Sequence, residues 1–269
     1  MTSHVTHLWR LLKWGRTLAR HGALMGIERD INTPMPVRRL VRLARLGAWV
    51  PKQPRYAEAF QAIGPAAIKL GQTLATRPDL VGEHAARDLL TLQDALPPVP
   101  FPQIRQAVES ALGGPLEQFY AQFDEQPVGS ASIAQVHRAV TTDGRDVAVK
   151  VQRPGISEQF ARDIETYEWA AAHLEQLGGE AKRLRPRLVI ANFRRWTARE
   201  LDLRREAASS SELAKAMAAE DGYIVPAIDW DRTTGRVMTM AWIDGIKISD
   251  RDALIAAGHD PKALAARLV

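Results

Sequence analysis

Apolar side chains recur every three to four residues over much of the first 115 positions, and this spacing predicts amphipathic helices. Near the N-terminus one such stripe consists of Leu8, Leu11, Leu12, Gly15, Leu18 and Ala19. Further helices are expected over Val37–Trp49, Tyr56 to about Thr76, Glu83–Gln93 and Phe101–Leu112, separated by prolines and by Gly113-Gly114. Pro65 marks either a bend or the start of a helix.

The pattern changes to strict alternation within residues 128–155. Val147, Val149 and Val151 alternate with other positions, which predicts a strand with Lys150 on the side opposite the valines. Asp143-Gly144 precedes this strand and predicts the turn of a β-hairpin.

Helical spacing returns over Ile156–Leu177, which is followed by Gly178-Gly179, and again from Pro186 to about Glu220. A second pair of strands is predicted over Tyr223–Ile228 and Arg236–Trp242, and the tail from Ser249 is predicted to be helical. Antiparallel strands combined with helices place the chain in the α+β class.

Composition narrows the class of protein. The chain has 269 residues, of which 46% are hydrophobic, enough for one or two cores. No apolar run approaches the roughly 18 residues of a membrane-spanning helix, and no signal peptide is expected. Because the sequence contains no cysteine, disulfides and thiolate metal sites are excluded, which suits a reducing compartment.

Basic residues are concentrated at the N-terminus. Residues 1–55 contain eleven Lys or Arg and two acidic residues, a net charge of +9, whereas the whole chain carries +5. Arg10 and Lys13 lie off the first apolar stripe, and Trp9 and Trp14 flank it. Such a helix either lies on an anionic membrane surface or packs on its own domain with a solvated basic face. No DNA- or RNA-binding motif accompanies the charge, so nucleic acid is not expected as a partner.

The predicted hairpin carries the first candidate chemistry. Protein kinases cover ATP phosphates with the loop G-x-G-x-x-G-x-V and place a lysine on the next strand in V-A-I-K. Here the three glycine positions hold Gly129, Ala131 and Ala134, and the strand reads V-A-V-K up to Lys150. Alanine lacks the positive φ and the close approach to a phosphate that glycine allows, so nucleotide should be held differently from an ordinary kinase. The alternative for Lys150 is a surface lysine whose stem packs on apolar neighbours.

The helix predicted after Pro186 carries a second candidate. Asp202 and Glu206 lie four residues apart, which places like charges on one helical face unless cations approach from elsewhere. The alternative is local neutralisation by Arg199 and Arg205 on a solvated face.

Lys69 and Gln72 form a third candidate, three residues apart on one face of an otherwise apolar helix. Gly71 between them lowers helix stability and would let another backbone come close. The alternative is that both polar side chains are simply exposed.

Four motifs occur in order along the chain. They are K-x-G-Q at Lys69–Gln72 followed by Arg77-Pro78-Asp79, the alanine-rich S-A-S-I-A-Q-V-H from Ser130, V-A-V-K, and E-L-D-L-R-R-E-A-A from Glu200. Over most of residues 55–250 they resemble the UbiB family of atypical protein-kinase-like proteins, which supports ubiquinone (coenzyme Q) biosynthesis in bacteria and mitochondria. Some bacterial members carry the name 2-polyprenylphenol 6-hydroxylase, but no flavin or haem motif is visible here, so oxygenase chemistry is not expected.

The resemblance implies catalytic roles on the K-x-G-Q side. Lys69 and Gln72 belong to a helix that folds over the place where a kinase binds its protein substrate. Glu200 and Asp202 form an E-x-D pair that Lys69 is expected to reach.

The resemblance also implies a nucleotide site. Its expected residues are Gly129, Ser130, Ala131 and Ser132 of the loop, Lys150, the helix residue Glu206 that should pair with it, and Met240 and Trp242 of the hinge. Gly129 stands where many relatives have alanine.

The implied fold is a kinase-like N-lobe with a helical K-x-G-Q extension and no C-lobe. We expect a basic helical segment over residues 1–54, the extension over 55–115, the N-lobe with its hinge over 116–248 and the start of a C-lobe over 249–269. The family's H-x-D-x-H-P-G-N loop, its Mg²⁺ ligands and its membrane anchor are expected beyond Val269. No metal ligands are therefore expected in this chain, which alone should be inactive.

The implied function is ATP binding and hydrolysis that supports ubiquinone biosynthesis, with Mg²⁺, at the cytoplasmic face of the inner membrane. Classical protein phosphorylation is less expected because the K-x-G-Q helix should obstruct the substrate site. The alternative is a non-catalytic lipid-handling or scaffold protein. It would bind an anionic membrane surface, quinone-precursor lipids or the biosynthetic complex through the basic helices.

Overall fold

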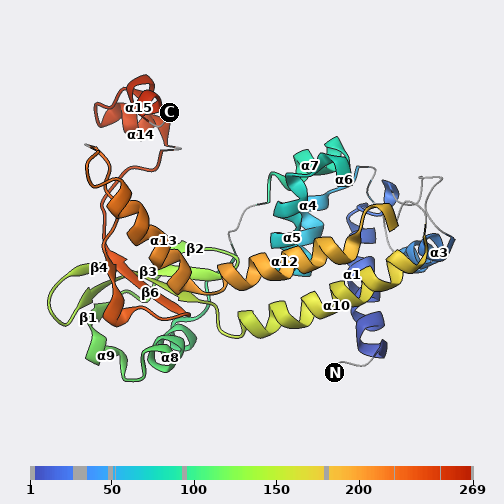
Figure 1. Ribbon diagram of the computed structural model, residues 1–269, viewed down its shortest axis with the longest axis horizontal. Helices are drawn as coiled ribbons and strands as arrows, with labels where there is room; N and C mark the ends of the chain where they lie inside the picture. The colour runs from blue at the N-terminus through green and yellow to red at the C-terminus, as the bar shows by residue number, and fades with distance from the viewer. Residues whose placement is uncertain are drawn as a thin grey trace.

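The computed structural model describes residues 4–26, 35–47, 51, 53–92, 96–178, 182–220, 222–248 and 250–267. An antiparallel sheet with strand order β1-β3-β4-β6-β5, and with β2 beside β3, lies at one end of the molecule (Figure 1). Its strands are β1 (Tyr120–Phe123), β2 (Gly129–Ser130), β3 (Ala134–Thr141), β4 (Asp146–Gln152), β5 (Ile228–Asp229) and β6 (Val237–Ala241). The predicted α+β class with a kinase-like N-lobe is confirmed.

One face of the sheet carries the valines of β4. Val147, Val149 and Val151 are buried in a cluster with Ile104 and Val108 of α8 (Phe101–Leu112). Lys150 lies opposite Val136 of β3 and Met238 of β6, so these three positions share the other face. The predicted separation of Lys150 from the valines is confirmed.

The predicted turn between β3 and β4 is also confirmed. Gly144 has φ +86°, a conformation that favours glycine, and its amide donates to the carbonyl of Thr141 over 2.9 Å.

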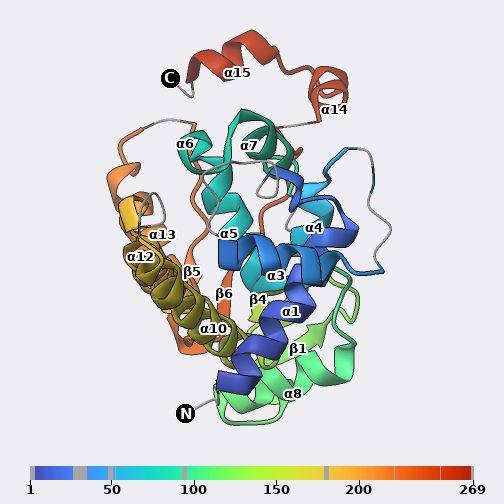
Figure 2. The same ribbon diagram turned by 90° about the vertical axis from the view of Figure 1, so that its right-hand side faces the viewer.

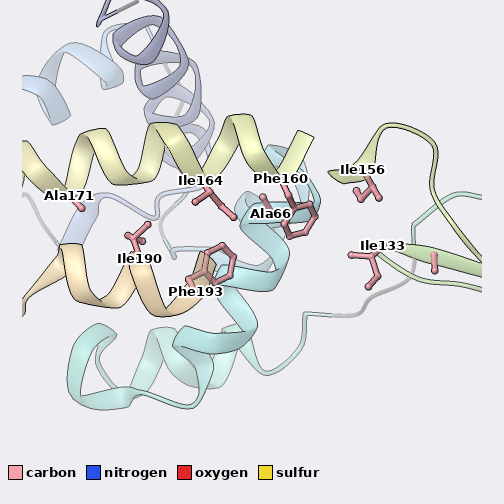
Figure 3. Close-up of a cluster of buried hydrophobic side chains, with 9 residues drawn as sticks. Ala66, Ile133, Ile156, Phe160, Ile164, Ala171, Ile190 and Phe193 are labelled. Atoms are coloured by element: carbon pink, nitrogen blue, oxygen red, sulfur yellow. The ribbon is translucent and has the colours of Figure 1, made fainter. Parts of the chain in front are cut away.

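Two long helices, α10 (Ile156–Gln176) and α12 (Pro186–Glu200), run side by side away from the sheet (Figures 1 and 2). Phe160 and Ile164 of α10 and Phe193 of α12 share a buried cluster, shown in Figure 3. Ala66, from a helix far earlier in the chain, completes the cluster and fixes the helical extension against this pair.

The extension consists of α4 (Tyr56–Ile63), α5 (Pro65–Ala75), α6 (Pro78–Val81) and α7 (Glu83–Leu89). Pro65 is the first residue of α5, so it starts a helix. A Cβ on Gly71 would lie 2.5 Å from Leu92 Cδ1 and 2.7 Å from Phe60 Cδ1. The expectation of a close backbone at Gly71 is therefore wrong, because side chains occupy that space.

The basic N-terminal helices are α1 (His4–Arg20) and α3 (Met35–Arg45), which lie against each other, and α1 also lies against α4 of the extension (Figure 2). The helix predicted over Val37–Trp49 thus ends earlier, at Arg45, and residues 48–50 lie outside the described part. The helix predicted over Glu83–Gln93 ends at Leu89, and residues 93–95 also lie outside it.

The single helix predicted from Pro186 to Glu220 is wrong. The chain breaks after Glu200, and a separate helix, α13 (Leu203–Ala216), begins at Asp202, whose side chain accepts the amide of Arg204. Asp is a strong N-cap, and Leu203 turns inward to pack, fully buried, against Met238. The prediction that Asp202 and Glu206 share one face inside a single helix is wrong for the same reason, because Asp202 is the N-cap of α13.

The strand predicted over Tyr223–Ile228 is largely wrong. Only Ile228 and Asp229 pair with β6, whereas Ile224 is 79% exposed and lies in an irregular segment. A 3₁₀ helix (Trp230–Arg232) leads into β6. The short α9 (Leu116–Phe119) and the strand β1 were not anticipated, and the helical tail is confirmed as α14 (Arg251–Ala256) and α15 (Pro261–Arg267).

Candidate functional site

The face of the sheet opposite the valines presents a lysine paired with a glutamate. Lys150 Nζ lies 2.6 Å and 2.8 Å from the two carboxylate oxygens of Glu206, in the first turn of α13. Burial of Leu203 and Ala207 against Met238 holds α13 in this position. The expected contact between Lys150 and Glu206 is therefore present, and Lys150 is not an unpaired surface lysine.

A second lysine links the helical extension to the end of α12. Lys69 Nζ lies 2.7 Å from Glu200 Oε1 and 5.9 Å from the centre of the Trp196 ring. The Lys69 side chain is only 9% exposed, so its charge depends on these partners. The alternative that Lys69 is simply exposed is wrong, and Gln72 lies partly buried three residues further along α5.

The two acidic residues of the E-x-D motif have different partners. Glu200 ends α12 and bonds Lys69, whereas Asp202 begins α13 and accepts two hydrogen bonds of 2.9 Å from Arg204. The guanidinium of Arg204 lowers the pKa of Asp202 below its usual range. The expectation that Lys69 reaches the pair thus holds for the Glu200 carboxylate, while Asp202 caps a helix.

Between the ends of α12 and α13 lies an open hollow of about 490 Å³. It is lined by Trp196, Arg199, Glu200, Arg205, Glu206 and Ser209. Both lysine-bound glutamates therefore border one hollow, together with two arginines that are suited to anionic groups.

The alanine-rich loop is a tight hairpin end. Gly129 and Ser130 pair with Val136 and Gln135 of β3, and the amide of Ala131 donates to the carbonyl of Ala134 over 2.8 Å. A Cβ on Gly129 would meet nothing within 4 Å, and its φ is not positive. The loop therefore needs no glycine for its own conformation, which explains how alanines are tolerated.

Burial of two loop residues and hydrogen bonds from Arg153 fix the position of this loop. Ile133 is 6% exposed and packs in the core beside α10, and Ser132 is fully buried. Arg153, after β4, donates from Nε to the carbonyl of Ala131 over 2.8 Å and from Nη2 to Ser130 Oγ over 2.7 Å.

Arg153 was missed by reasoning from the sequence. Its Nη2 also donates to the carbonyl of Pro97, in the segment that leads from the extension to the sheet, over 3.0 Å. Burial lowers the pKa of its guanidinium. Its sequence context, Arg153-Pro154-Gly155, signals only the end of a strand, because its acceptors in Ala131, Ser130 and Pro97 lie far from it in the sequence.

The expected hinge lies at the end of β6. Met240 is paired with Ala148 and Met238 with Lys150, so the two methionines share the lysine face. The amide of Trp242 donates to the carbonyl of Asp146 over 3.1 Å, and its indole Nε1 donates to Asp244 over 2.8 Å. Arg138 stacks over the Trp242 ring at 4.9 Å, so this ring is fixed at the edge of the sheet.

The described residues contain neither a cluster of metal ligands nor a membrane-spanning helix. No group of three or more His, Asp and Glu side chains in that part of the chain is arranged to hold a metal ion. None of the helices described is long and apolar enough to cross a membrane.

Comparisons with known proteins place this geometry in a family context. The ABC1 atypical kinase-like domain matches residues 91–269. A probable protein kinase UbiB of Marinobacter nauticus is 41% identical over 207 residues, which are 77% of this chain and 38% of the relative. A probable protein kinase UbiB of Xylella fastidiosa is 39% identical over 239 residues, 86% of this chain and 43% of the relative. The chain thus spans about two fifths of the length of these curated relatives.

Among solved structures, the complex of Rv3197 with erythromycin from Mycobacterium tuberculosis is similar to this chain. It has a TM-score of 0.48 and 31% sequence identity, covering 70% of this chain and 46% of that one.

Proposed function

Since the chain belongs to the ABC1 atypical kinase-like family and its curated relatives are probable UbiB protein kinases, we propose that it forms part of an ATP-binding site. The whole protein would be a UbiB-type ATPase that supports ubiquinone biosynthesis. The loop of Gly129, Ser130, Ala131 and Ser132 would face the phosphates, and the strand end from Met240 to Trp242 would flank the adenine.

The observation that carries the proposal is the pair between Lys150 and Glu206. In kinases the corresponding lysine contacts the α- and β-phosphates and is held by a glutamate from a neighbouring helix. Here both carboxylate oxygens bond the ammonium, so Lys150 is oriented before any ligand arrives. Its neighbour Ala148 lies opposite Met240, which leaves a small residue and a flexible apolar one beside it for a flat aromatic ring.

ATP hydrolysis is favoured over phosphorylation of a separate protein. Lys69 is buried and bonded to Glu200, and Ala66 packs in the core with α10 and α12. This position of α5 would leave little room for a peptide substrate. Mg²⁺ would neutralise charge on the phosphates when bound, and its ligands would come from the part of the relatives that this chain does not span.

Thermal unfolding with and without Mg-ATP tests the proposal. We expect ATP to raise the melting temperature of the wild-type chain, and Lys150→Ala to abolish most of the shift, because a phosphate contact is lost. Lys215→Ala, at an exposed position of α13, is the matched control and should retain it. If ATP does not raise the melting temperature of the wild-type chain, the proposed nucleotide binding is refuted.

The second proposal concerns location. We propose that the parent protein associates peripherally with the cytoplasmic face of the inner membrane through α1 and α3, in contact with anionic lipid, quinone-precursor lipids or the biosynthetic complex. These two helices together carry eight Lys or Arg and no Asp or Glu, and they expose Trp9, Leu40 and Leu43.

Flotation with anionic vesicles tests this location. Reversal of Lys13, Arg16, Arg39 and Arg42 to glutamate should weaken flotation, since all four side chains are exposed. Arg10 is left unchanged because its guanidinium donates to the carbonyl of Arg162 on α10 over 2.7 Å. Unchanged flotation of the reversed protein would refute the proposed role of these helices.

A further inference from the structure

The apolar stripe of α1 does not form a flat outer surface. Leu11, Leu12 and Gly15 line a cavity of about 690 Å³ whose other walls are α3 and the outer half of α10. Val41 and Ala44 of α3 line the same space. Its volume lies in the range of pockets that hold small organic ligands.

A hydrogen bond and two aromatic contacts join α1 to α10 beside the cavity. His7 Nδ1 lies 3.0 Å from Thr166 Oγ1, and the His7 ring stacks on Trp169 at 5.8 Å. The Trp14 ring lies 5.1 Å from Tyr167. α1 is therefore joined to one turn of α10, residues 166–169, and Tyr167 and Trp169 of this turn also line the cavity.

Several lining residues are also exposed, and these mark the mouth. Leu8 is 44% exposed, Leu40 is 49% and Leu177 is 40%. The mouth is thus bordered by α1, α3 and the end of α10, and the first two helices carry the eight cations and no acidic residue.

The acidic side chains of α10 near this region have other partners. Glu168 accepts two hydrogen bonds of 2.7 Å from Arg194, and Glu175 accepts the amide of Arg187 over 3.1 Å. Arg194 therefore neutralises Glu168, whereas Glu175 keeps its charge, and the eight cations of α1 and α3 outnumber the five acidic residues of α10.

We propose that this cavity takes one acyl chain of an anionic phospholipid, with the headgroup at the cations of α1 and α3. The inference rests on the proposed membrane association and adds a defined site to it. An apolar space removes the chain from water, and the positive charge of the two helices that border its mouth favours an anionic headgroup over an uncharged quinone ring.

Photolabelling tests the proposal with the full chain. Anionic phosphatidylglycerol vesicles that carry a diazirine on one acyl chain are irradiated with the protein, and labelled residues are mapped by mass spectrometry. We expect labels on Tyr167, Ala171 and Leu174, which line the cavity from α10. Labels confined to exposed residues such as Trp9 and Leu43 would overturn the cavity as the site, while leaving membrane association intact.

A filled cavity provides the matched comparison. Ala170→Phe, at a lining position, should reduce α10 labelling at least tenfold without reducing flotation. Ala161→Phe, the same change at an exposed position of the same helix, should change neither. Should Ala170→Phe not fold, Gln176→Trp, at an exposed lining position of α10, makes the same test. Equal labelling of the filled and unfilled proteins would overturn the proposal.

A labelling experiment without vesicles separates failure of the proposed membrane association from failure of the proposed cavity site. If the protein does not float, a diazirine-bearing fatty acid below its micelle concentration is used instead. Absence of α10 labels there overturns the cavity site as well, and labels there would overturn a membrane lipid as its source. A concentration-dependent dimer that shields the cavity residues from label would assign the cavity to a second copy of the chain and overturn lipid binding.

Discussion

Lys69 of α5 and Glu200, the last residue of α12, form an ion pair of 2.7 Å between segments more than a hundred residues apart. The Lys69 side chain is 9% exposed and the Glu200 side chain 28% exposed. Loss of the carboxylate would leave a buried ammonium with weaker compensation, which costs more than loss of a surface pair.

We therefore expect Glu200→Gln to lower the free energy of unfolding by about 1–3 kcal/mol, between the costs of exposed and fully buried pairs. Glu168→Gln breaks a pair that is about 40% exposed on both sides and should cost less than about 1 kcal/mol. Urea denaturation of both variants measures the difference. Equal costs would mean that burial of Lys69 contributes nothing.

Arg153 should control the alanine-rich loop. Its guanidinium joins Ala131, Ser130 and Pro97 in directions that a single ammonium does not reproduce. We expect Arg153→Lys to destabilise the chain by about 1–2 kcal/mol and to accelerate hydrogen exchange at the Ala131 amide. Arg236→Lys, at an exposed position, is the control. Unchanged exchange at Ala131 would contradict this role.

His137 should make the fold sensitive to acid. Its Nδ1–H donates to the carbonyl of Asp124 over 2.7 Å, and Nε2 accepts from Gln135 over 2.8 Å, so the buried ring is bonded in its neutral form. Burial lowers the pKa of His137 below 6.5. Stability from this group is therefore complete above pH 6.5 and lost as the pH falls below it, because the unfolded chain binds the proton more readily.

The expected loss is at most about 1.4 kcal/mol per pH unit. Urea denaturation from about pH 7 to about pH 5 should show this slope in the wild type, and His137→Phe should flatten it at a lower overall stability. His259→Gln, at an exposed histidine, should keep the wild-type slope. A slope that survives in His137→Phe would assign acid sensitivity to other groups.

Replacement by alanine should destabilise the protein at Gly71 but have almost no effect at Gly129. Gly71→Ala brings a methyl to 2.5 Å from Leu92 Cδ1 in a packed core, and we expect a loss of about 1–3 kcal/mol despite better helix propensity. Gly129→Ala meets nothing within 4 Å and should change stability by less than about 0.5 kcal/mol. Thermal unfolding distinguishes them, and a neutral Gly71→Ala would mean that the side chains of Leu92 and Phe60 move aside at little cost.

Structural features that depend on residues close in the sequence were predictable. The turn at Gly144 and the separation of Lys150 from the valine face depend on near neighbours, whereas the sequence left Pro65 open between a bend and a helix start. The motif residues were placed by family resemblance, which correctly paired Lys150 with Glu206 and Lys69 with Glu200.

Features that depend on distant partners were not predictable. The break at Asp202 requires Leu203 to bury against Met238, and the acceptors of Arg153 lie in segments far from it in the sequence. The stripe of α1 was visible in the sequence, but its role as one wall of a cavity depends on where α3 and α10 lie. The sequence by itself determined which faces are apolar or basic, because those follow from residue type and spacing, whereas the glutamate partners of the two lysines came from family resemblance. Only the tertiary structure decided what each face meets, because packing between distant segments is set by the burial of all of them together.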